Sequence, residues 1–186
     1  TPLKGLVERV LGNAGFDPSW IQVAYGDGAF ASQLIDQKPE KIFFTGSVGT
    51  GKKIMAQAAR HLIPVELELG GKDPMIVFED ANLERAAAGA VWGAFTNAGQ
   101  SCTSVERLYV QESIYEKFKA AVLRETSRIQ LGVDSDGDAD YGRMTTPFQI
   151  QAVREQVEQA KKQGAKVLTG QNWNGTYALV PPLVIE

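Results

Sequence analysis

The feature that most constrains the fold is a repeated order of strand followed by helix along the chain. A short apolar run precedes helix-favouring residues around positions 42–61, and the same order returns around positions 74–98. This order is typical of parallel sheets whose faces are covered by helices, and it predicts an α/β protein. The expected strands are Ile42-Phe43-Phe44, Val65-Glu66-Leu67-Glu68-Leu69, Pro74 to Phe78 and Leu108-Tyr109-Val110, with further strands at Val167-Leu168-Thr169 and Tyr177 to Val180.

Capping residues predict where helices begin. Thr1 and Pro2 suit the N-cap and the first position of a helix. Asp80 is the expected cap of an alanine-rich helix, on which Trp92 and Phe95 should face the core. Ser or Thr followed three residues later by Glu or Gln predicts two further starts, at Ser113-Ile114-Tyr115-Glu116 and at Thr146-Pro147-Phe148-Gln149.

Composition excludes several classes of protein. With 44% hydrophobic and 22% charged residues over 186 positions, the chain should fold rather than remain disordered. The net charge of −3 leaves no excess of cations for nucleic acid, which is not an expected partner. No apolar run approaches the roughly 20 residues of a bilayer span, so a membrane is not expected either. The single cysteine, Cys102, cannot form an internal disulfide, and we expect a cytoplasmic protein.

A glycine-rich segment at positions 45–51 follows one of the expected strands and precedes a helix. Backbone N–H groups and a helix N-terminus would converge there on a space suited to a phosphate. The Walker pattern is nearly complete, but Lys53 stands where its hydroxyl residue belongs. The dinucleotide pattern G-x-G-x-x-G is absent, because the glycines are Gly46, Gly49 and Gly51. A turn used only for tight packing of helix on strand is the alternative.

Glu68 is a candidate general base. It ends an alternating strand and is followed by Gly70 and Gly71, which would allow close approach of a ligand or backbone. Partial burial would raise the pKa of its carboxyl toward neutral pH. Glu66 would share the same face of the strand, so alternation does not choose between the two, and a solvated glutamate at the edge of a strand is the alternative.

Cys102 is a candidate nucleophile. It lies in the small, polar run Asn97-Ala98-Gly99-Gln100-Ser101-Cys102-Thr103, whereas a structural cysteine prefers apolar neighbours. Among backbone N–H donors the thiol could be held partly as the nucleophilic thiolate. An inert thiol is the alternative.

No metal site is expected. His61 follows a helix and has no Cys or His nearby in the sequence, so it is interpreted as a cation at a helix C-terminus. The acidic run from Asp134 to Asp140 departs from the spacing of a calcium-binding loop and is interpreted as solvated.

Three of these segments together resemble the aldehyde dehydrogenase superfamily. The first two are Phe44-Thr45-Gly46-Ser47 with Gly51, similar to its cofactor loop, and Glu68-Leu69-Gly70-Gly71-Lys72, similar to its glutamate motif; the third is Phe95-Thr96-Asn97-Ala98-Gly99-Gln100-Ser101-Cys102, similar to its cysteine motif. The resemblance implies part of a Rossmann-like NAD(P)-binding domain over residues 1–69, followed by part of the α/β catalytic domain over residues 70–186.

The resemblance also implies a reaction. Cys102 would attack the carbonyl of a small aldehyde, hydride would pass to NAD or NADP, and Glu68 would activate water to cut the resulting thioester. It further implies a homo-oligomer and a set of cofactor-binding residues. These are Gly26, Gly28, Thr45, Gly46, Ser47, Gly51 and Leu69.

The resemblance places this sequence in the central part of a longer family member. The asparagine that is the second oxyanion donor and the lysine that binds the adenosine ribose would lie upstream, and loss of one oxyanion donor costs about 10²–10³ in rate. We therefore expect weak or absent turnover from the chain as written. Two alternatives are an inactive fragment or paralogue that acts as a binding or oligomerisation module, and a phosphate-binding P-loop protein.

Overall fold

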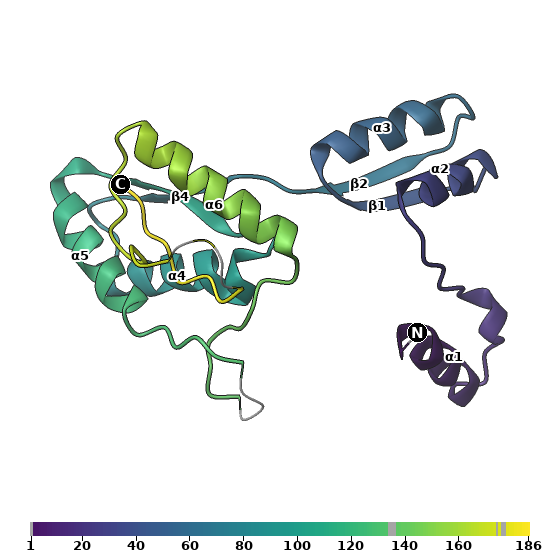
Figure 1. Ribbon diagram of the computed structural model, residues 1–186, viewed down its shortest axis with the longest axis horizontal. Helices are drawn as coiled ribbons and strands as arrows, with labels where there is room; N and C mark the ends of the chain where they lie inside the picture. Colours follow the sequence, from purple (N-terminus) through teal and green to yellow (C-terminus); the bar gives the residue numbers. More distant parts are fainter. Residues whose placement is uncertain (1, 134–136, 174, 176–177) are drawn as a thin grey trace. The chain divides into compact units, whose positions relative to one another are not determined.

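The computed structural model describes residues 2–133, 137–173, 175 and 178–186, and the chain divides into two compact units (Figure 1). The units are Thr1–Leu69 and Gly70–Glu186. Each unit contains a two-stranded parallel sheet with helices, so the expected α/β class is confirmed. The predicted cap at Thr1 and part of the acidic run, 134–136, lie outside the described residues.

The first unit begins with helices and then alternates strand with helix. Its parallel strands β1 and β2 are joined through helix α3, which is the βαβ connection that a parallel pair requires. Its elements are α1 (Pro2–Asn13), η1 (Pro18–Trp20), α2 (Gly28–Asp36), β1 (Ile42–Gly46), α3 (Val48–Ala59) and β2 (Val65–Leu69).

The core of the first unit lies between its sheet and the helices α2 and α3. Ile35 and Ala58 from the two helices are buried, and Ile42 from β1 packs against them. The predicted strand Ile42-Phe43-Phe44 is present, but the apolar run is not buried as a whole, because Phe43 is 76% exposed. Alternation along β1 turns Phe43 to the face of the sheet that α2 and α3 do not cover.

The side chain of Gln57 fixes α3 beside α2. Its amide nitrogen donates to the Ser32 carbonyl at 2.9 Å and to the Asp36 carboxylate at 2.8 Å. His61 extends the contact, with its Nε2 atom 3.7 Å from the Asp36 carboxylate. The C-terminal halves of the two helices therefore lie side by side.

The second unit has the same local order and a longer C-terminal part. Strands β3 and β4 pair in parallel, and α4 makes the connection between them. Its elements are β3 (Asp73–Val77), α4 (Leu83–Phe95), η2 (Thr96–Gly99), β4 (Val105–Val110), η3 (Glu112–Ile114), α5 (Tyr115–Thr126) and α6 (Pro147–Lys162).

The core of the second unit joins β3 to α4 and α5. Val77 and Phe118 are each 2% exposed, and Ala87, Ala90 and Val91 of α4 are buried with them. These alanines let the two helices approach closely. Phe95 packs against this cluster as predicted, whereas the prediction for Trp92 is wrong because Trp92 is 73% exposed.

Two of the three predicted caps in this unit are wrong. Asn82, rather than Asp80, caps α4 by accepting the Arg85 amide at 3.1 Å. Ser113 is part of η3 and donates its hydroxyl to Glu79, so α5 begins without a side-chain cap. Thr146 accepts the Gln149 amide at the start of α6, as predicted.

The C-terminal segment returns to the body of the second unit. Val167 forms an isolated antiparallel bridge with Ile185, and the described residues of 167–169 and 177–180 form no strand, so the two strands predicted there are wrong for the described residues. The carboxylate of Glu186 accepts hydrogen bonds from the Lys119 ammonium at 2.8 Å and the Tyr115 hydroxyl at 2.6 Å. These two bonds lower the pKa of Glu186, that of Lys119 contributing most. Among the described residues, no helix is both long and apolar enough to cross a bilayer.

Candidate active site

Four of the predicted site residues lie together at the carboxyl ends of β1 and β2. The register of the parallel pair sets Thr45 beside Glu68 and Gly46 beside Leu69. Thr45 and Glu68 are both exposed, on the face of the sheet away from α2 and α3. Ligands of open α/β sheets bind at this edge, so the topology places these residues where a ligand can reach them.

The two neighbouring glutamates of β2 differ in their surroundings. Glu66 forms an ion pair with Lys41 at 3.0 Å. No ion pair or hydrogen bond joins the side chain of Glu68 to any residue that the structure describes, and its carboxylate is exposed. The structure therefore distinguishes the two glutamates, which alternation alone could not do. Of the two, Glu68 has the carboxylate without a partner among the described residues, and it lies nearer the end of the strand.

The connection from β1 to α3 is much shorter than the expected glycine-rich loop. Only Ser47 lies between Gly46, the last residue of β1, and Val48, the first of α3. Ser47 caps the helix by accepting the Thr50 amide at 3.2 Å. A Walker loop wraps around its phosphates with several residues, and this connection has one. The structure therefore contradicts the P-loop alternative.

The start of α3 is nevertheless suited to an anion. The amides of Val48 and Gly49 precede the first intrahelical hydrogen bonds, and both residues are exposed. The helix dipole adds partial positive charge at the same place. Lys52 and Lys53 follow in the next turn, exposed and without an ion pair among the described residues. A pyrophosphate would fit this end of the helix.

Gly51 brings α3 close to β2. A Cβ atom at Gly51 would lie 2.9 Å from Cδ2 of Leu69 and 3.6 Å from Cδ1 of Leu67. Leucine side chains of β2 thus occupy the space that a side chain at position 51 would take, and Gly51 is buried. In this structure the close approach that Gly51 permits is that of the strand.

Helix α2 is the second α-helix of this unit. It lies beside the C-terminal half of α3, where Ser32 and Asp36 accept hydrogen bonds from Gln57, and its start is set back from the end of the sheet at which α3 begins (Figure 1). Asp27 caps α2 by accepting the amides of Ala29 and Phe30, each at 3.0 Å. Gly28 has open space where a Cβ would be, whereas a Cβ at Gly26 would meet the Phe30 ring.

Cys102 lies in the second unit, in a pair of consecutive turns between α4 and β4. The first turn is closed by the Gln100 amide on the Asn97 carbonyl at 3.1 Å, and the second by the Ser104 amide on the Ser101 carbonyl at 3.3 Å. Cys102 is the second residue of the second turn, and its thiol is free and exposed. The polar segment therefore presents the sulfur to solvent instead of packing it in the core.

The first turn has unusual backbone angles. Asn97, Ala98 and Gly99 all have left-handed φ values, of 55°, 56° and 73°. Glycine adopts this region freely and asparagine tolerates it, but for alanine it costs about 1–2 kcal/mol. Such backbone persists only where the surroundings hold it, and it occurs often at functional sites.

Ser104 and Gln100 hold these turns, and sequence reasoning missed both. The Ser104 hydroxyl is buried and lies 3.2 Å from the carbonyls of both Gly93 and Ala94, in the last turn of α4. Gln100 accepts the Thr145 amide at 2.9 Å. A serine two residues after the cysteine gives no signal of its own, because its partners lie on another element.

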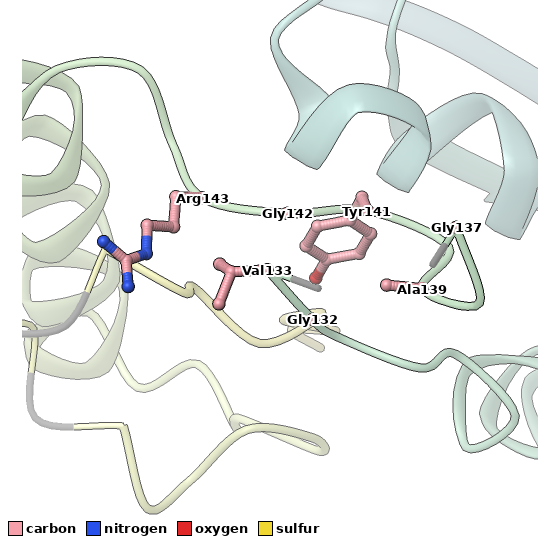
Figure 2. Close-up of a pocket in the computed structure, with 7 residues that line it drawn as sticks. All are labelled: Gly132, Val133, Gly137, Ala139, Tyr141, Gly142 and Arg143. Atoms are coloured by element: carbon pink, nitrogen blue, oxygen red, sulfur yellow. The ribbon is translucent and has the colours of Figure 1, made fainter. Parts of the chain in front are cut away.

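A hollow in the described part of the second unit contains none of the predicted site residues. It has a volume of about 620 Å³. Figure 2 shows Tyr141, Gly142 and Arg143 on one segment and Gly132 and Val133 on the segment opposite. The Tyr141 hydroxyl donates to the Val180 carbonyl at 2.9 Å, and burial raises the pKa of this tyrosine. The described residues that line the hollow include no carboxylate, and no cluster of metal ligands occurs within the described ranges.

These features define the class of the protein. It is an α/β fold that presents an exposed thiol in a braced turn, that is, a turn held by the hydrogen bonds of Gln100 and Ser104. The matching family model is that of the aldehyde dehydrogenase family, over residues 2–186. The chain is 46% identical over 165 residues to a 4,4'-diapolycopene aldehyde oxidase of Methylomonas sp, covering 89% of this chain and 31% of that protein. The chain belongs to the aldehyde dehydrogenase family.

Solved structures agree with this membership. Betaine aldehyde dehydrogenase from Staphylococcus aureus, in complex with NAD+, has a TM-score of 0.87 and 30% identity, covering 95% of this chain and 36% of that one. Glyceraldehyde-3-phosphate dehydrogenase GapN from Methanocaldococcus jannaschii, complexed with NADP, has a TM-score of 0.89 and 30% identity, covering 99% and 40%. The chain thus spans about a third of the length of the relatives that it matches.

Proposed function

We propose that this chain carries the catalytic thiol of an NAD(P)-dependent aldehyde dehydrogenase, which oxidises a small aldehyde to a carboxylic acid. The observation that carries the proposal is Cys102, a free and exposed thiol in a braced turn of a chain that belongs to this family. We further propose that residues 1–69 are part of the NAD(P)-binding domain and residues 70–186 part of the catalytic domain.

Cys102 is the nucleophile in this proposal. Its thiolate adds to the aldehyde carbonyl and forms a thiohemiacetal, which loses its carbon-bound hydrogen as hydride and becomes a thioester. The Cys102 backbone amide donates to no acceptor among the described residues, and it is therefore available to the oxygen that becomes negatively charged. The exposed second position of a turn allows an aldehyde to approach both the sulfur and this amide.

Glu68 is the proposed base for the second half of the reaction. The thioester is cut by water, whose proton passes to a carboxylate as the carbon–oxygen bond forms, and the thiol is released. Glu68 is unengaged and exposed at the end of β2, whereas its neighbour Glu66 is paired with Lys41. Both the free carboxylate and its position at the ligand-binding edge of the sheet favour Glu68 for this role.

The nicotinamide cofactor, NAD or NADP, supplies the acceptor for the hydride. Its pyrophosphate fits the exposed amides of Val48 and Gly49 and the hydroxyl of Ser47 at the start of α3. The remaining proposed contacts are Thr45 and Gly46 at the end of β1, Leu69 at the end of β2, Gly51 in α3, and Gly26 and Gly28 at the start of α2.

Two wider proposals accompany this chemistry. A reactive thiol needs a reducing compartment, so the free Cys102 favours the cytoplasm. The family resemblance favours an assembly of several copies, and the light scattering of the purified chain tests it. A mass of one chain at all concentrations would refute the assembly.

Steady production of NADH or NADPH in the presence of an aldehyde tests the proposed function. Because the chain spans about a third of its relatives' length, we expect a low rate from the wild type, none from Cys102→Ala, and the wild-type rate from Glu66→Gln. The alternative, a binding module without turnover, predicts no cofactor reduction by any variant. It also predicts that iodoacetamide reacts with Cys102 no faster than with a free-thiol model at pH 7.

A further inference from the structure

Gln100 connects the turn before Cys102 to a distant part of the second unit. Its amide nitrogen donates to the Asn97 carbonyl at 3.0 Å, and its amide oxygen accepts the Thr145 backbone N–H at 2.9 Å. Asn97 reciprocates by donating its side-chain amide to the Gln100 carbonyl at 3.2 Å. One side chain therefore both closes the left-handed turn and ties it to the residue that precedes the cap of α6.

The turn that carries Cys102 is held at its two ends by different residues. At the downstream end, the buried Ser104 hydroxyl bonds to the last carbonyls of α4. At the upstream end, the bond from Thr145 to Gln100 is the hydrogen bond that joins the described residues 97–101 to a segment distant in sequence. Without it, the two left-handed residues Asn97 and Ala98 would be free to relax.

We propose that Gln100 is a positioning residue that fixes the direction in which the chain presents the Cys102 thiol. Thr145 suits this purpose because the next residue, Thr146, caps α6, and a helix start is a firm attachment point. The inference rests on the proposed function for its purpose, since attack on a carbonyl depends strongly on the placement of the nucleophile. The placement itself can be measured without that function.

The single cysteine makes a direct test possible, because a nitroxide spin label attaches only at Cys102. The wild-type chain should give a spectrum with a motionally hindered component. Gln100→Met keeps the length of the side chain but removes both amide bonds, and this component should be lost. Gln171→Met is the matched control: Gln171 braces a different turn through the carbonyls of Val167 and Leu168, and its loss should leave the spectrum unchanged.

Unchanged label mobility in Gln100→Met, with wild-type circular dichroism, would overturn the proposal. Hydrogen exchange of the Thr145 amide in the wild-type chain is the second measurement, and it needs no variant. Slow exchange supports the bridge, and exchange at the rate of an unprotected amide would overturn it.

The unlabelled enzyme supplies a separate readout. In Gln100→Met we expect kcat to fall by about 10²-fold with little change in KM. Mobility and exchange need neither aldehyde nor cofactor, so an inactive wild-type chain would leave the Gln100 test intact, and the proposed function would be decided by whether Cys102 forms a thioester with the aldehyde. If the wild-type chain is active and the label on Cys102 is equally mobile in the wild type and in Gln100→Met, the role of Gln100 alone would be refuted.

Discussion

Replacing Ser104 by alanine should destabilise the second unit by about 1–3 kcal/mol. The hydroxyl lies 3.2 Å from each of two carbonyls and the residue is 4% exposed, so water cannot take its place in the alanine variant. The loss combines a hydrogen bond worth about 1 kcal/mol with the cost of leaving a buried carbonyl without a donor. For a unit of this size, each kcal/mol lowers Tm by about 4 °C.

The matched control for this prediction is Ser127→Ala. The Ser127 hydroxyl also donates to a carbonyl in the last turn of a helix, that of Arg124 at 2.7 Å, but the residue is exposed. Water can replace that hydroxyl, so we expect a change within about 0.5 kcal/mol. Hydrogen exchange of the α4 amides under native conditions measures the stability of this unit separately from the other unit.

Equal stabilities of Ser104→Ala and Ser127→Ala would refute the reasoning. That result would mean that the buried hydroxyl does not compensate the end of α4, and that the Cys102 turn has no anchor at its downstream end.

Three further predictions concern the proposed base Glu68, the core of the second unit and the side-chain carboxylate of Glu186. Glu68→Gln should leave acylation partly intact and slow deacylation by about 10²–10⁴-fold, which would be seen as a burst of cofactor reduction followed by a slow phase. Glu66→Gln should keep the wild-type steady rate, and a defect of Glu68→Gln confined to binding would contradict the role of Glu68. Phe118→Ala should lower the free energy of unfolding by about 3–5 kcal/mol in chemical denaturation, because its side chain is buried, and Trp92→Ala by no more than about 0.5 kcal/mol, because its side chain is exposed. Comparable losses in the two variants would show that the core is misassigned. The lowered pKa of Glu186 means that its stabilising effect is present above the ordinary carboxyl pKa and is lost as the pH falls through the lowered value. Glu186→Gln should therefore flatten the acid side of the plot of unfolding free energy against pH. An unchanged acid side would contradict the stabilising role of Glu186.

The alternation of strand and helix was readable from the sequence because it depends on local patterns. Thr146 was identified as a cap because its hydroxyl bonds within its own turn. Ser113 has the same pattern and fails, because its hydroxyl donates to Glu79, which is 34 residues away. Trp92 shows an error of a different kind: helical periodicity from the buried Ala87, Ala90 and Val91 places position 92 on the opposite face.

The residues of the candidate site were readable, but their supports were not. Cys102 and Glu68 stand out by residue type and motif, and the exposed carboxylate of Glu68 is a feature of tertiary structure that alternation cannot reveal. The left-handed backbone at Ala98 could not be predicted, since alanine has no preference for it. The bonds of Gln100 and Ser104 join segments up to 45 residues apart, and no local pattern encodes them.

The mass of the intact chain after incubation with an aldehyde and NAD+ or NADP+ tests the central claim most directly. The account predicts an adduct equal to the aldehyde less two hydrogen atoms, located on Cys102, longer-lived in Glu68→Gln and absent from Cys102→Ala. Failure to form this adduct, or an adduct of the same mass on Cys102→Ala, would contradict it.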